Sequence, residues 1–132
     1  MFKLKTMSKL LYAELSEKVL GAALNVHREL GPGLLENAYK FALMHELDER
    51  KIKYQTEIPI PMVYKGQKLD CGYRADFLVE DHLILELKAA EHMHNLFKAQ
   101  LMTYLRLSER KVGLLINFNT ELLKNGVIRL VM

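Results

Sequence analysis

The chain reads RADFLVEDHLILELK from Arg74 to Lys88, and this stretch decides the fold. Two short apolar runs flank the polar residues 80–82, which is typical of two strands joined by a tight turn. Because side chains alternate across a strand, the second run has two faces, with Ile84, Glu86 and Lys88 on one and Leu83, Leu85 and Leu87 on the other. We expect the leucine face to be buried. A carboxylate and an ammonium on so apolar a strand indicate a functional site.

Asp76 in the first of these strands and Glu86 in the second form a candidate acidic metal site. Mg²⁺ prefers carboxylate oxygens, and the backbone carbonyl of Leu87 would be a nearby third ligand. Hydrolysis of a phosphodiester needs a nucleophilic water and neutralisation of charge on the phosphate, both of which Mg²⁺ can supply. Lys88 would lie beside the metal, where it could orient or deprotonate the water or stabilise charge on the phosphate.

Three further residues could complete this site. Glu36 lies in the first turn of a predicted helix and could add a ligand or position a metal-bound water, although a carboxylate there also suits the helix dipole. Gln100 and Tyr104 are four residues apart on another predicted helix, so they share a face and could bond to phosphate. A tyrosine on a helix flank is as often a packing residue.

The remaining patterns predict an α/β fold with a mixed central sheet flanked by helices. Ser16 is a candidate N-cap for the first helix, and the Gly31-Pro32-Gly33 run would end it. The predicted helices span residues 17–30, 34–50 and 95–108, and the predicted strands span 52–64, 69–79, 83–88, 111–117 and 127–132.

The first predicted strand carries the clearest alternation. Its apolar residues Ile58, Ile60, Met62 and Tyr64 would share one face. Pro59 and Pro61 cannot donate backbone hydrogen bonds, so we expect this strand at a sheet edge. The following Lys65-Gly66-Gln67 predicts a hairpin turn.

The composition is that of a folded globular domain. The 132 residues are 50% hydrophobic and 27% charged, and we expect one domain over residues 1–132, with residues 1–9 frayed. The single Cys71 excludes a disulfide within one chain and indicates a reducing compartment. No run suits a transmembrane helix and the start lacks a signal-peptide pattern, so we expect a cytoplasmic location and no membrane partner. A net charge of +3 is too small to indicate nucleic-acid binding by itself.

Asp76 followed by Glu86-Leu87-Lys88 resembles the D…(D/E)xK signature of the PD-(D/E)XK nuclease superfamily. Residues 33–39, GLLENAY, match the motif of the GxxExxY family, a group of small bacterial and archaeal proteins in that superfamily. The stretches VHRELGPG (26–33), GYRAD (72–76) and GLLINF (113–118) also look similar to that family. The resemblance runs from about Leu10 to the C-terminus.

This resemblance implies a restriction-endonuclease-like α-β-β-β-α-β core and Mg²⁺-dependent cleavage of phosphodiester bonds, with Mn²⁺ as a substitute cation. The site residues it implies are Asp76, Glu86 and Glu36 for the metal, Lys88 as the catalytic lysine, and Gln100 and Tyr104 in support. Phe97 departs from the family pattern, because a histidine often stands three residues before the glutamine.

Other polar residues have simpler interpretations. His27 and Tyr39 are interpreted as structural residues, and Arg74 could contact phosphate or pair with Glu86. Three basic residues could form a phosphate-facing surface, although scattered basic residues usually lie on solvated faces: Lys40, Lys98 and Arg106.

The hypothesis favoured by the complete motif is a metal-dependent nuclease that acts on nucleic acid, with DNA expected. The alternative is a catalytically silent nuclease-like domain that binds nucleic acid or a partner protein, which the small size of the chain favours. A third hypothesis is an oligomeric scaffold whose carboxylates merely bind ions. An edge strand could pair with another chain, so a homodimer and a partner protein both stay open.

Overall fold

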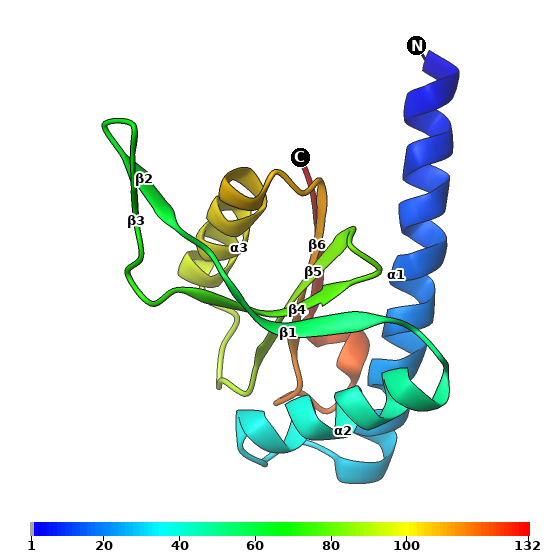
Figure 1. The fold of residues 1–132 in the computed structure, drawn as a ribbon. Helices are drawn as coiled ribbons and strands as arrows, with labels where there is room; N and C mark the ends of the chain where they lie inside the picture. Colours follow the sequence, from blue (N-terminus) through cyan, green and yellow to red (C-terminus); the bar gives the residue numbers. More distant parts are fainter. Residues whose placement is uncertain (1) are drawn as a thin grey trace.

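The computed structural model describes residues 2–132, with side chains from Tyr12 onward (Figure 1). The elements in chain order are α1 (Phe2–Leu30), α2 (Glu36–Glu49), β1 (Tyr54–Pro59), β2 (Met62–Tyr64), β3 (Gln67–Leu69), β4 (Arg74–Val79), β5 (Leu83–Lys88), α3 (Asn95–Ser108), β6 (Val112–Asn117), the 3-10 helix η1 (Leu123–Gly126) and β7 (Val127–Val131). Within the described chain, no helix is both long enough and apolar enough to cross a bilayer.

A five-stranded sheet in the order β1-β4-β5-β6-β7 forms the centre of the fold. The β5–β6 pair is parallel, with α3 as the crossover, and the other pairs are antiparallel. The predicted α/β class with a mixed sheet is therefore confirmed. The succession α2, β1, β4, β5, α3, β6 is consistent with the restriction-endonuclease-like core.

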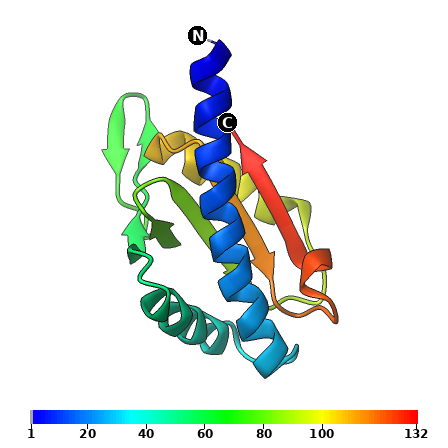
Figure 2. The same cartoon turned by 90° about the vertical axis from the view of Figure 1, so that its right-hand side faces the viewer.

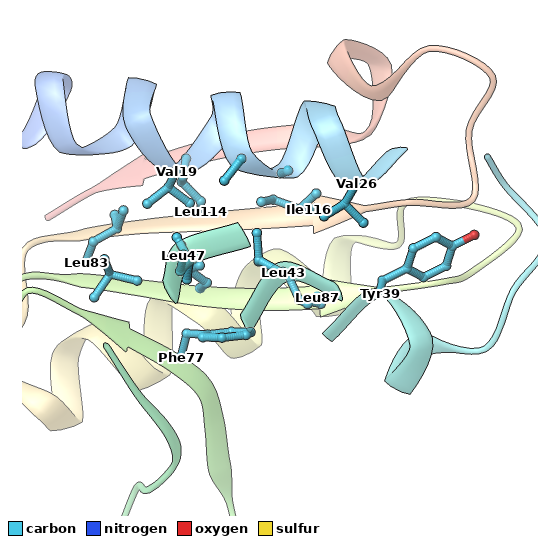
Figure 3. Packing of buried hydrophobic residues seen from close by; sticks show 14 of the residues in the cluster. Val19, Val26, Tyr39, Leu43, Leu47, Phe77, Leu83, Leu87, Leu114 and Ile116 are labelled. Carbon is cyan, nitrogen blue, oxygen red and sulfur yellow. The ribbon is translucent and has the colours of Figure 1, made fainter. Parts of the chain in front are cut away.

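Helices cover both faces of this sheet. α1 and α2 lie on one face and α3 lies on the other, as Figures 1 and 2 show. The predicted alternation in β5 is confirmed, because its leucines join the core under α1 and α2 whereas Ile84 packs under α3. Figure 3 shows the first of these cores, in which Leu83 and Leu87 meet side chains of α1 and α2 such as Val26, Leu43 and Leu47.

The first helix is longer than predicted. It begins at Phe2, and the N-cap prediction for Ser16 is wrong. The Ser16 hydroxyl donates a 2.7 Å hydrogen bond to the carbonyl of Tyr12, one turn earlier, and this bond lets a serine lie inside a helix. Fraying of residues 1–9 stays a prediction, and Met1 lies outside the described residues. The helix ends as expected, with Gly31 at φ 67° and its N–H bonded to the carbonyl of His27.

Two predicted strands are each divided in the structure. The run 52–64 separates into β1 and β2. Its alternating apolar residues differ in burial, since Ile60 lies in the core at 1% exposure whereas Tyr64 is 59% exposed. The run 69–79 separates into β3 and β4 around Gly72, whose φ of 82° and bond to the Asp70 carboxylate make a turn. The edge position predicted for β1 is confirmed.

Strands β2 and β3 form a separate two-stranded sheet, which extends away from the main sheet in Figure 1. The predicted turn is confirmed, since Lys65 and Gly66 have φ values of 50° and 77° and join paired strands. At the base of the hairpin, the N–H of Ile60 donates to the carbonyl of Tyr73.

Candidate active site

Asp76 lies where β4 and β5 separate. The paired register runs from Val79–Leu83 to Phe77–Leu85, and its continuation by one residue places Asp76 opposite Glu86. Beyond that point the backbone N–H of Leu87 donates to Asp76 Oδ2 at 2.7 Å. The carboxylate thus replaces the backbone acceptor that a continued ladder would have provided.

Glu86 is the second member of this pair, and its side chain is buried at 4% exposure. Burial, then a hydrogen bond with Asp76 and the charge of that residue, raises the pKa of Glu86 to about 10. Lys88 acts in the opposite direction, but its charge is the smaller influence. At neutral pH and without a cation, the two carboxylates, hereafter the acidic pair, therefore hold a proton.

Lys88 lies beside the acidic pair and is held from the side of α3. Its Nζ donates to Gln100 Oε1 at 3.4 Å and lies 4.8 Å from the centre of the Phe97 ring. Phe97, at the position where a histidine often stands in the family that the sequence resembles, thus provides a cation–π contact. Both contacts come from neutral groups, so the lysine keeps its charge available at the site.

Glu36 and Tyr104 approach the acidic pair from opposite helices. Glu36 is the first residue of α2, and partial desolvation followed by the charge of Asp76 raises its pKa, while the charges of Lys88 and Lys40 lower it. Tyr104 of α3 is 5% exposed, and burial followed by the charge of Glu86 raises its pKa to about 12. Its hydroxyl therefore stays protonated and can donate a hydrogen bond.

The six predicted site residues are thus neighbours at one end of the sheet, but the three carboxylates are not equally close. Among the side chains that the structure describes, from Tyr12 onward, no three of the kinds that bind metals lie close enough together to hold an ion. Asp76 and Glu86 form the close pair, and Glu36 acts on them at longer range. A metal-binding role for Glu36 stays a prediction.

Two surface hollows of the protein are not lined by any of the six predicted site residues. These open hollows, of about 890 and 600 Å³, lie at the opposite end of the sheet, beside the turn between β4 and β5. Glu80 lines both of them.

Hydrogen bonds between the end of β6 and the segment after β5 stabilise the site, and the sequence analysis did not predict them. Asn117, the last residue of β6 and 2% exposed, donates to the carbonyl of Ala90 at 2.9 Å and accepts from its N–H at 3.0 Å. These two hydrogen bonds fix the position of the segment that leaves β5 just after Lys88. An asparagine within the apolar run GLLINF was the available signal, because a buried amide must find partners.

The turn before Glu36 is held by the same region. The Tyr39 hydroxyl donates to the carbonyl of Gly31 and accepts from the N–H of Leu34, while its ring stacks on Phe118 at 4.6 Å. Asn119 Oδ1 accepts from the N–H of Gly33 at 3.1 Å. These contacts support the structural interpretation of Tyr39.

His27 is also placed as a structural residue, since its Nε2 lies 2.7 Å from the carbonyl of Thr120. Arg74 pairs with Asp70 at 3.3 Å rather than with Glu86.

The fold and the site together define an α/β protein with an acidic pair and a lysine at one end of a mixed sheet. The family model of the PD-(D/E)XK nuclease superfamily matches residues 13–130, and the chain belongs to this superfamily. Neither the curated proteins nor the solved structures include a match to the chain.

Proposed function

We propose that the protein is a metal-dependent nuclease that hydrolyses phosphodiester bonds of nucleic acid, with DNA as the expected substrate. The observation that carries this proposal is the acidic pair, with Lys88 two residues after Glu86 on the same strand. Membership in a nuclease superfamily supports nucleic acid as the substrate class.

The oxygen ligands of the site suit Mg²⁺. Burial first, and then the hydrogen bond and charge of Asp76, raise the pKa of Glu86 to about 10, so without a cation the acidic pair favours a bound proton over a second negative charge. A divalent cation would favour the deprotonated pair and so take the place of the shared proton. Asp76 and Glu86 would hold Mg²⁺, with Glu36 as a further ligand, and Mn²⁺ would accept the same oxygens.

When bound there, Mg²⁺ supplies a nucleophilic water and neutralises charge on the phosphate. Lys88 has three N–H donors, of which one is used by Gln100, so the others can donate to the attacking water or to a phosphate oxygen. The Tyr104 hydroxyl is a second donor for the phosphate. Hydrolysis forms a bond between the water oxygen and phosphorus, breaks one ester P–O bond and leaves a proton on the departing oxygen.

The finer assignment to the GxxExxY family is part of this proposal. Its named residues correspond to Gly33, Glu36 and Tyr39. Support comes from the hydroxyl of Tyr39, which holds the turn from Gly31 to Leu34 and thereby fixes the start of the helix that carries Glu36.

The test compares the wild type with Lys88→Met and Asp76→Asn on single- and double-stranded DNA and RNA, with Mg²⁺, Mn²⁺ or EDTA. Both substitutions preserve size, and Lys18→Met is a matched control because this exposed lysine lies on α1 beside the opposite end of the sheet. We expect cleavage by the wild type and the control in Mg²⁺ or Mn²⁺, and a loss of more than about a hundredfold in both site variants.

A different pattern would support the alternative. If the wild type binds nucleic acid but cleaves no substrate with either cation, the domain is a silent nuclease-like binding module. If cleavage persists in Lys88→Met and Asp76→Asn at the rate of the control, the assigned site is wrong.

A further inference from the structure

Lys40 lies one helical turn after Glu36 on α2, so both side chains emerge on the same face of the helix. Its ammonium is ion-paired with the Glu57 carboxylate. The Lys40 side chain is only 12% exposed, whereas that of Glu57 is 58% exposed. Of the two interpretations of Lys40, the solvated face does not fit, because the lysine side chain is largely covered whereas that of its partner lies mostly in solvent.

Glu57 has an unusual backbone conformation for a strand residue. It lies in β1 with a φ of 53°, and the register between β1 and β4 places it opposite Asp76, between the pairs Thr56–Phe77 and Ile58–Ala75. L-residues rarely adopt this conformation, and such residues concentrate at functional sites. Here the distortion accompanies an ion pair with α2 directly next to the acidic pair.

Two ammonium groups therefore act on Glu36, next to the acidic pair, and they are held differently. Lys88 is held by a neutral amide and an aromatic ring, so its charge is available. Lys40 is held by a carboxylate, so its charge is neutralised in the free protein. The charges of both lysines act on Glu36, which places Lys40 within electrostatic range of the site.

We propose that Lys40 and Glu57 form a second phosphate-binding site, at which a backbone phosphate next to the cleaved one displaces Glu57 and pairs with Lys40. This inference rests on the proposed nuclease function, because it assigns the site to the same nucleic-acid strand. Glu57 can leave without loss of hydration, since its carboxylate is already largely in solvent. The Lys40 side chain is only 12% exposed and its charge acts on Glu36, so we expect it to stay at the site when Glu57 leaves.

A phosphate suits this position better than a cation does. An ammonium repels a metal ion, whereas phosphates recur along every nucleic-acid strand and lysine binds them as a compact point charge. The exchange replaces one anion by another, so the enclosed lysine keeps a partner in both states. Glu57 acts as a competitor for the phosphate and would weaken binding of any ligand that lacks one at this place.

The test measures binding of a fluorescein-labelled DNA duplex by anisotropy over a series of KCl concentrations, in Mg²⁺. All variants carry Lys88→Met so that cleavage does not consume the probe. The test variants are Lys40→Met, Glu57→Gln and the pair together, with Lys18→Met and Glu17→Gln as controls on the exposed surface of α1.

We expect Lys40→Met to weaken binding about tenfold and to reduce the steepness of the salt dependence by about 0.9, the value for one phosphate contact on duplex DNA. Glu57→Gln should strengthen binding about threefold, because it removes the competitor for one charge-assisted contact. In the Lys40→Met background, Glu57→Gln should have no effect beyond that of Glu17→Gln, since the two residues act through one another.

The inference is overturned if Lys40→Met binds as the Lys18→Met control does, or if both test variants weaken binding equally, as loss of a structural ion pair would. Thermal melting in EDTA confirms that each variant is folded. The outcome is separate from that of the nuclease test. Opposite effects of the two variants on binding support the phosphate site even if the chain without Lys88→Met does not cleave, and cleavage with unchanged binding refutes it.

Discussion

Replacing Asp76 by alanine and by asparagine separates its role in the fold from its role at the site. The Asp76 carboxylate is the acceptor for the N–H of Leu87, a residue with 0% exposure. Alanine leaves this N–H without a partner, which costs about 2 kcal/mol of the free energy of unfolding. Asparagine keeps an oxygen in the same place, so Asp76→Asn should lose less than about 1 kcal/mol. Both variants remove the charge next to Glu86, and their difference therefore measures the hydrogen-bonding groups of the side chain, which are the acceptor for Leu87 and the partner of Glu86.

Urea denaturation followed by circular dichroism in EDTA gives this difference. For a chain of this size, about 2 kcal/mol corresponds to a melting temperature roughly 8 °C lower for Asp76→Ala. In Mg²⁺ at about ten times its dissociation constant, the wild type should gain about 1.4 kcal/mol, and neither variant should gain as much. Equal free energies for the two variants in EDTA would refute the reasoning about Leu87. An equal Mg²⁺ gain in the wild type and both variants would refute the metal site.

Three further predictions concern other parts of the fold. In EDTA, the free energy of unfolding should fall as pH rises between 4.5 and about 10, because folded Glu86 retains a proton that the unfolded chain releases. Glu86→Gln should reduce this slope in urea denaturation at several pH values, and an unchanged slope would contradict the assignment. Gly113→Ala should lower the free energy of unfolding in urea by about 1–3 kcal/mol, because the added Cβ would lie 2.9 Å from the side chain of Leu101 in α3. An unchanged free energy of unfolding would contradict this expectation. Within residues 12–132, trypsin should cut first at Lys65 or Lys68 on the exposed hairpin, as mass spectrometry of the fragments would show, and earlier cuts elsewhere in this range would contradict the prediction.

The sequence predicted the centre of the fold better than its periphery. The bounds of β5 and α3 agree with the predictions, because both runs have one strong period and clear ends. The division of 52–64 was not foreseeable, since apolar alternation continues through the point where the chain leaves one sheet for another. The N-cap prediction for Ser16 failed because a serine side chain can bond either at the start of a helix or to a carbonyl inside one.

At the site, alternation correctly placed Glu86 and Lys88 on one face of β5. The bond from Leu87 to Asp76 could not be predicted, because it depends on where two strands separate. The pairing of Lys40 with Glu57 could not be predicted either, because it accompanies the positive φ of Glu57, which no sequence pattern indicates.

The end of β6 and the residues just after it bond to two distant parts of the chain, through Asn117 to Ala90 and through Asn119 to Gly33. An inserted residue just before Asn117 would shift both contacts at once and so disturb the segments next to Lys88 and Glu36 together. The hairpin of β2 and β3 is different, because the bond between Ile60 and Tyr73 closes its base. Insertions and deletions accumulated over evolution should therefore concentrate in the hairpin and avoid the end of β6. Related proteins should thus differ in the length of the β2–β3 hairpin and agree in the length of the segment at the end of β6.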